Sequence, residues 1–185
     1  MAYNERKTAQ IAARLIGLSG ASMNIVKLMK LLYLVDREAL RRGHRPLTGD
    51  RMVSMPRGPV LSATYEVTNG MSTLAGGWSD WMTDRSNHKI ALRGDCPARD
   101  DLDELSDNDL AVVDGVWEKF GPMGQWDLVE FTHQNCKEWV DPRGSSLPIS
   151  YQDVLRAQGF SEGDAARVAA EIDHENELDR LFAGA

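Results

Sequence analysis

The sequence predicts a mainly α-helical fold of the α+β class: a compact multi-helix domain around one buried central helix, with a small antiparallel β-sheet or hairpin. Residues 24–36 are apolar on nearly every face, and a helix that is apolar all round must be buried. Most other apolar residues recur at helical spacing, whereas residues 78–93 show the shorter period of strands. A chain of 185 residues can bury a core without disulfides or metals. We therefore expect one domain over residues 1–185, with residues 161–185 as a C-terminal helical extension.

The first two helices follow from periodicity and capping residues. Residues 3–18 carry apolar side chains at helical spacing and lead into glycines, so we expect an amphipathic helix packed on the central one. The central helix is predicted over residues 24–42, because Asn24 is a suitable N-cap and Leu, Met and Lys favour helices. Arg41 and Arg42 would lie at the negative end of its dipole, with Gly43 as the left-handed C′ residue. Its buried face should include Leu28, Leu31, Leu32 and Val35.

A turn-rich corner over residues 45–50 follows the central helix. We expect a further helix of about three turns over residues 59–69. The Gly58-Pro59 step can place proline at the first helical position, and Asn69-Gly70 can end the helix in a left-handed residue.

Two segments in the middle of the chain favour strands. Residues 78–83 and 89–93 flank a polar stretch at residues 84–88, the layout of a hairpin with a longer loop. An isolated two-stranded hairpin is marginally stable, so it must gain a strand or lie on the helices. Residues 52–55 could supply that third strand.

The second half of the chain is predicted to be helical. Ser106 with its following aspartates opens a helix that runs to Phe120, and shorter helices are expected over residues 125–134 and 149–158. Residues 161–182 repeat apolar side chains at helical spacing with a polar gap near the end. The last turns are therefore expected to pack loosely or to await a partner.

Composition limits the function. The two cysteines, Cys96 and Cys136, are too few for a disulfide framework, which fits a reducing compartment. No cationic and apolar leader and no membrane-spanning run is evident, so we expect a cytoplasmic protein with no membrane partner. The formal net charge of −7 repels phosphate backbones, which makes nucleic acid an unlikely partner.

Residues suited to catalysis are scattered. The four histidines, His44, His88, His133 and His174, belong to no metalloprotease, nucleophile or phosphate-binding motif. His133 and Cys136 form a His-x-x-Cys pair, but no second pair exists to complete a metal site. We therefore expect no metal and no cofactor, and interpret Cys136 as a small buried hydrophobe.

Asp36 is the charged residue that most needs explanation, since a carboxylate on an apolar helix must emerge into solvent or find a partner. The candidate partners are Arg57, His133 and the neighbours of Arg37. We favour a structural Asp36–Arg57 pair, because the planar guanidinium can bond both carboxylate oxygens. Trp139, between a polar stretch and a proline-rich loop, is expected to seal a groove.

Several motifs occur in a fixed order: Lys27 to Tyr33, Pro46 to Asp50, Met55 to Val60 with Tyr65, and Thr132-His133 followed by Trp139. With these motifs, residues 11–155 resemble the Panacea domain family, also known as SocA-like or phage-associated GepA-like proteins. The resemblance implies a mostly helical fold with a small sheet, no cofactor and no enzymatic activity. Members of the family are antitoxins of bacterial toxin–antitoxin pairs, and one acts as an adaptor that delivers its toxin to a Clp protease.

The resemblance makes an antitoxin that contacts a cognate toxin, encoded by an adjacent gene, the leading hypothesis. The acidic chain would suit a basic toxin, because complementary fields speed association. An adaptor for a Clp-type protease is the alternative, with residues 161–185 as its second surface. A hydrolase that uses Asp36, His133 and Cys136 is a weaker hypothesis. The family-motif residues, structural or partner-binding, are Lys27, Lys30, Leu31, Leu32, Tyr33, Asp36, Gly49, Asp50, Arg57, Gly58, Pro59, Val60, Tyr65, Thr132, His133 and Trp139.

Overall fold

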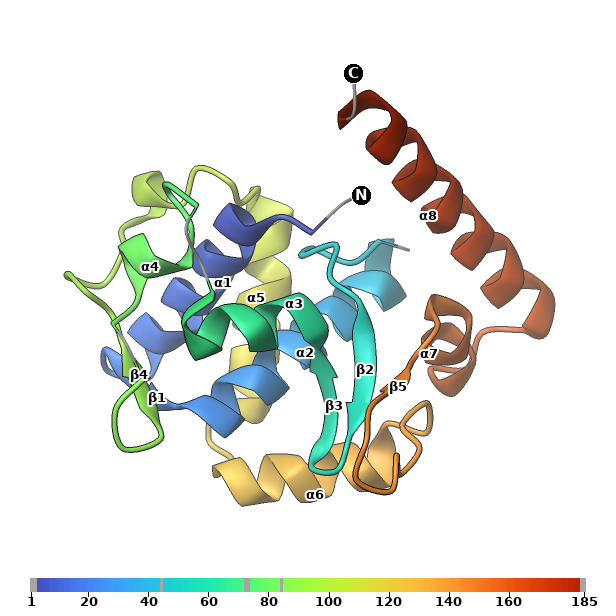
Figure 1. The fold of residues 1–185 in the computed structure, drawn as a ribbon, viewed down its shortest axis with the longest axis horizontal. Coiled ribbons are helices and arrows are strands. Elements are labelled where there is room, and N and C mark those ends of the chain that lie inside the picture. The colour runs from blue at the N-terminus through green and yellow to red at the C-terminus, as the bar shows by residue number, and fades with distance from the viewer. Residues whose placement is uncertain (1–2, 44, 72–73, 84, 184–185) are drawn as a thin grey trace.

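A computed structural model describes residues 3–43, 45–71, 74–83 and 85–183. These residues form eight α-helices and five short strands arranged around α2, which lies at the centre of the molecule (Figure 1). The mainly helical fold with a small antiparallel sheet is confirmed. The helices are α1 (Glu5–Leu18), α2 (Ile25–Gly43), α3 (Ser62–Glu66), α4 (Trp78–Trp81), α5 (Asp107–Phe120), α6 (Gln125–Asn135), α7 (Tyr151–Ala157) and α8 (Glu162–Ala183).

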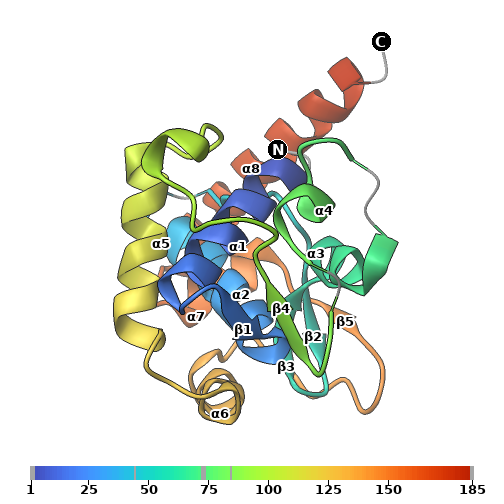
Figure 2. The same ribbon diagram turned by 90° about the vertical axis from the view of Figure 1, so that its left-hand side faces the viewer.

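Helix α2 is the buried centre that the sequence predicts. It packs against α1, α5, α6 and α7 and against the first and third strands, and Figure 2 shows α1 and α5 beside it. The Asn24 side chain caps the helix by accepting a hydrogen bond from the Val26 N–H at 2.9 Å. The predicted buried residues Leu28, Leu31, Leu32 and Val35 are all 0% exposed.

The prediction of a left-handed Gly43 after the C-terminus of the central helix is wrong. Gly43 is the last residue of α2 and is absent from the glycines with positive φ, so it is not a left-handed C′ residue. The following Arg45-Pro46 step explains the stop, because proline disfavours helical conformation in the residue before it.

The strands form two small antiparallel sheets. In the first, β1 (Ser22–Asn24) pairs with β4 (Lys89–Ala91). In the second, β2 (Met52–Met55) lies between β3 (Gly58–Leu61) and β5 (Leu147–Pro148). The strand at residues 52–55 is therefore confirmed, but it belongs to a sheet of its own and does not join β4.

Residues 58–61 were expected to lead into a helix with Pro59 at its start, and this prediction is wrong. They form β3, joined to β2 by a two-residue turn, and the helix begins only at Ser62. Proline is compatible with an edge strand, which is the position of β3 in the sheet. The left-handed stop at Gly70 is confirmed, with φ of 90°.

The predicted strand at residues 78–83 is also wrong. Residues Trp78–Trp81 form the single turn of α4, and only Met82 makes a β-bridge, to Leu92. The strand at residues 89–91 is present but takes β1 as its partner. Strand pairing between distant segments depends on how the helices place them, which local periodicity cannot show.

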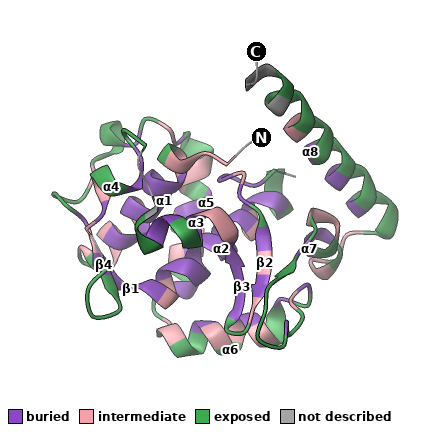
Figure 3. Ribbon diagram, viewed as in Figure 1, coloured by how far each residue is buried: buried purple, intermediate pink, exposed green. Residues whose placement is uncertain are grey.

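The second half of the chain agrees with the prediction. Ser106 caps α5: its hydroxyl accepts from the Asp109 N–H at 3.2 Å, and the Asp109 carboxylate accepts from the Ser106 N–H at 3.0 Å. Helix α8 is continuous through the polar gap, and Figure 3 shows it mostly exposed beyond its first turns. Its buried face consists of Ala165, Val168, Ala169 and Ile172.

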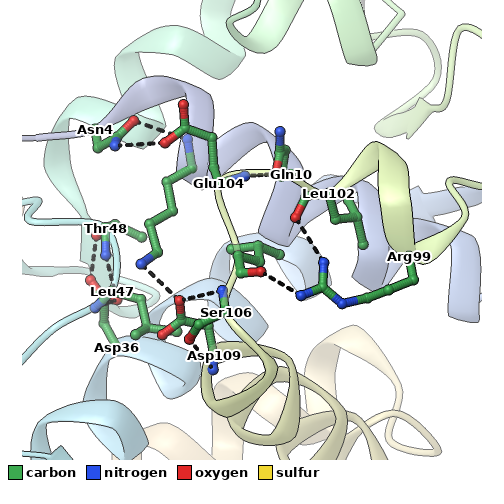
Figure 4. A network of polar contacts seen from close by, with 12 residues as sticks. Asn4, Gln10, Asp36, Leu47, Thr48, Arg99, Leu102, Glu104, Ser106 and Asp109 are labelled. Atoms are coloured by element: carbon green, nitrogen blue, oxygen red, sulfur yellow. Dashed lines mark hydrogen bonds and ion pairs between the residues drawn. The ribbon is translucent and has the colours of Figure 1, made fainter.

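A polar network fastens the segment before α5 to α1 (Figure 4). The Glu104 N–H donates to Gln10 at 2.9 Å, and Lys7 pairs with Asp109 at 2.9 Å. The Asn4 amide donates to Glu104 at 3.3 Å. The segment that leads into α5 is thus held in place by α1 and by Asn4 before it.

Candidate functional site

The structure brings one group of the motif residues together where α2, the β2–β3 hairpin and α6 meet. We call this group the hairpin cluster. Its members come from three stretches of chain that are far apart in sequence. They are Lys30, Gly58, Pro59, Thr132, His133 and Trp139.

Lys30 is the central residue of the hairpin cluster. It is 1% exposed, and its ammonium donates to the Pro59 carbonyl at 2.7 Å. Burial lowers the pKa of Lys30 to about 7. Gly58 lies beside it with φ of 95°, and a Cβ there would lie 2.8 Å from both the Lys30 Nζ and the Thr132 Oγ1. The motif glycine therefore lets the hairpin approach α2 and α6 closely.

His133 and Trp139 close the cluster on its outer side. Their rings stack with centroids 4.2 Å apart, and the indole Nε1 donates to the Met55 carbonyl at 3.0 Å. The buried Nε2 of His133 has no hydrogen-bond partner among the described residues. Burial, and then the nearby charge of Lys30, lowers the pKa of His133. The imidazole is therefore mainly neutral at neutral pH.

An exposed surface lies over the tip of the hairpin. The Arg57 guanidinium lies over the Trp126 ring, 5.8 Å from its centroid, and Trp126 is 57% exposed. Beside them is a pocket of about 260 Å³, and Tyr65 at its edge is 40% exposed. We call Arg57, Tyr65, Trp126 and this pocket the hairpin-tip surface. The apolar part of the pocket includes Ile25, Val26, Met29, Met55, Pro56 and Val60.

The prediction that Asp36 pairs with Arg57 is wrong. The Asp36 carboxylate accepts from the N–H groups of Leu47 and Thr48, at 2.8 and 3.0 Å, and from the Thr48 hydroxyl (Figure 4). Burial raises the pKa of Asp36 to about 6, and these three donors limit the rise. Arg57 is exposed on the hairpin instead. Residues 46–48 supply the backbone donors to Asp36 because this turn folds back over α2.

Asp50 has a similar structural position. Its carboxylate accepts from the Ala63 and Thr64 N–H groups, at 2.9 and 2.7 Å, and from the Thr64 hydroxyl at 2.7 Å. It therefore caps α3 from a distant segment. Gly49 precedes it in left-handed backbone, with φ of 67°.

A buried ion pair joins α2 to the segment after α6, and sequence reasoning missed it. Arg37 Nε donates to the Glu138 carboxylate at 2.6 Å, and the Tyr33 hydroxyl donates to the same oxygen at 2.6 Å. The Glu138 side chain is 0% exposed. The available signal was that Tyr33 and Arg37, four residues apart, share one face of α2.

The remaining motif residues lie close to these groups. The Lys27 ammonium donates to the Gly121 carbonyl at 2.5 Å and lies 5.4 Å from the centroid of the Trp117 ring. Leu31 and Leu32 are fully buried in the core.

The residues of the hydrolase hypothesis do not form a nucleophile and base. Asp36 is bonded to Leu47 and Thr48, and Cys136 is 0% exposed. Burial raises the pKa of Cys136 to about 12, which keeps it a thiol. Among the described residues no group of three His, Cys, Asp or Glu side chains could hold a metal ion. His44 lies outside those residues.

With this geometry in view, the chain can be compared with known proteins. The family described as "Antitoxin SocA-like, Panacea domain" matches it over residues 28–140. The chain belongs to this family. The Panacea domain match begins in α2 and contains every motif residue named above except Lys27, while α7 and α8 follow it. Neither the curated proteins nor the solved structures gave a match. In the parts of the chain that the structure describes, no helix is long and apolar enough to cross a membrane.

Proposed function

We propose that this protein is the antitoxin of a bacterial toxin–antitoxin pair and neutralises a cognate toxin in the cytoplasm by binding it directly. Membership of the antitoxin family supports this class of function. We place the contact at the hairpin-tip surface. There an exposed tryptophan with an arginine over it lies beside an apolar pocket, and tryptophan and arginine are enriched in interface hot spots.

The hairpin cluster supports this placement by its rigidity. Lys30 and Trp139 each donate to a carbonyl of the hairpin, at 2.7 and 3.0 Å. A surface that is held in its binding conformation loses less entropy on association than a mobile one. We therefore propose that the hairpin cluster positions Arg57 and has no catalytic role.

The test combines co-expression with binding. The product of the adjacent reading frame should be lethal alone and harmless with this protein. Trp126→Ala should abolish rescue and weaken toxin binding by roughly 2 kcal/mol or more, the size of an interface hot spot. Because the Trp126 side chain is exposed, the melting temperature of the Trp126→Ala variant should differ little from that of the unmodified protein. Leu74→Ala, at a 46% exposed apolar residue that does not line the hairpin-tip pocket, is the control.

Full rescue by Trp126→Ala would remove the hairpin-tip surface from the proposal. An adjacent product that is harmless alone would remove the antitoxin function itself.

Delivery of the toxin to a Clp-type protease is the second candidate. One observation favours it: the end of α8 carries exposed apolar side chains, with Leu178 at 40% and Leu181 at 72% exposure. An adaptor needs a second surface of this kind in addition to the one that holds the toxin.

A further inference from the structure

A second cavity lies beside the C-terminal half of α2, and none of its lining residues belongs to the hairpin cluster. It measures about 590 Å³ and is bordered by α2, α5, α6 and the segment after α7. We call it the arginine groove. Its cationic lining is Arg37, Arg41, Arg42 and Lys119.

The charges of the arginine groove do not balance. Arg37 is matched by the buried Glu138, which leaves Arg41, Arg42 and Lys119 against a single lining carboxylate, Glu38. The groove therefore has a surplus of two positive charges in a chain whose formal net charge is −7. A local field opposite to that of the whole molecule indicates an anionic ligand.

Glu38 already shows how an oxyanion can bind there. Arg41 donates Nε and Nη2 to its two oxygens, at 2.9 and 2.7 Å, and Arg42 donates Nε at 2.6 Å. Among the residues that the structure describes, Arg42 makes only this bond, so its terminal nitrogens keep free donors. The Lys119 ammonium lies 5.0 Å from the centroid of the Phe120 ring and forms no ion pair with another described residue.

Asn135 and Gln158 also line the groove, and one part of its wall is apolar. Leu34, Val116 and Phe120 are buried there, and Phe131 lies against Phe120 with ring centroids 4.9 Å apart. The cavity is of the size of small-molecule sites and much larger than one phosphate group needs. Its ligand should therefore combine an anionic group with an apolar or aromatic body.

We propose that the arginine groove binds a small phosphate monoester, with the phosphate at Arg41, Arg42 and Lys119 and an aromatic body against Phe120 and Phe131. A phosphate carries a charge near −1.5 to −2 at neutral pH, which matches the surplus of two, whereas one carboxylate does not. Arginine forks bond phosphate oxygens in pairs.

Calorimetric titration of the full chain at low ionic strength tests this proposal. The probes are phenyl phosphate and AMP, with phenol, adenosine and inorganic phosphate as their parts. Both esters should bind, and each part should bind at least about tenfold more weakly, because it lacks one of the two kinds of contact. The affinity of the esters should also fall with added salt.

Three variants locate the ligand. Arg41→Gln with Arg42→Gln should weaken ester binding by roughly tenfold to a hundredfold, as expected for lost charged hydrogen bonds. Arg167→Gln is the matched control, since Arg167 also pairs with carboxylates three and four residues away and is similarly exposed. Glu38→Gln should tighten binding, because it removes the carboxylate that competes for the two arginines.

Two results would overturn the proposal. One is failure of both esters to bind the unmodified protein. The other is unchanged affinity in the double arginine variant when its melting temperature shows that it is folded.

Discussion

Lys30 and Asp36 are charged residues of α2 that are buried among its apolar neighbours. Lys30 donates to the Pro59 carbonyl, and Asp36 accepts from the 46–48 turn. Each residue therefore fastens a different loop to the same helix. Both were identifiable from the sequence as charges in an apolar helix, but their partners were not.

Lys30 should make stability depend on pH. Its pKa is about 7 in the folded protein and about 10.4 when unfolded, so between these values the unfolded chain binds more protons. The contribution of Lys30 to stability should therefore rise as pH increases from 7 towards 10. Lys30→Met, which cannot titrate, should reduce the gain between about pH 7 and 9 by about 2 kcal/mol.

Urea unfolding of both proteins at the two pH values measures this difference. Cys136, whose raised pKa lowers stability at alkaline pH, is present in both proteins, and the main cause of its shift, burial, is common to both. His133 titrates mainly below this range because its pKa is lowered. Equal pH dependence in the two proteins would mean that Lys30 titrates normally in the fold.

At the scale of the element, the β2–β3 hairpin is defined by how closely it approaches α2 and α6. Gly58 has both a left-handed backbone and no room for a Cβ. Gly20 has almost the same φ, 90°, but nothing within 4 Å of the position of a Cβ. Comparing substitutions at the two glycines therefore separates the cost of an unfavourable φ from the cost of placing a Cβ where there is no room for it.

Gly20→Ala should cost about 1 to 2 kcal/mol, the penalty for a left-handed alanine. Gly58→Ala should cost more, by a further 1 to 3 kcal/mol or so, because the methyl group must displace Lys30 or Thr132. Denaturant unfolding of the two variants measures the difference. Equal losses of stability would show that the hairpin moves freely away from α2.

At the scale of the whole molecule, the family match covers residues 28–140 and the chain continues into α7 and α8. Arg45 pairs with Glu175, which ties α8 to the segment after α2. Beyond that point the exposed Leu178 and Leu181 remain available to a partner. We propose that residues 161–185 form an extension of the single domain and not part of its core.

A double variant, Leu178→Ala with Leu181→Ala, separates masking from delivery. If the protein masks the toxin, the variant should bind it and rescue growth as the unmodified protein does. If it delivers the toxin to a protease, the variant should still bind but should fail to lower the toxin level in growing cells. Immunoblotting of the toxin after co-expression, with Trp126→Ala as the variant that loses binding, distinguishes these outcomes.

Local sequence signals predicted the central helix, its buried face and the capped start of α5. These features depend on periodicity and on hydrogen bonds that span a few residues, such as the Ser106–Asp109 pair. The motifs of the Panacea domain were also evident, because they consist of short runs in a fixed order. The sequence by itself thus determined the centre of the fold and its family.

Only the tertiary structure decided which distant groups meet. Lys30 finds its acceptor 29 residues away, and Tyr33 and Glu138 are 105 residues apart. Residues 58–61 became a strand because β2 and α2 accommodate them there, although their local pattern also permits the start of a helix. Such contacts depend on the packing of all the elements together, so a pattern read along the chain could identify Asp36 as needing a partner but could not choose Thr48 over Arg57.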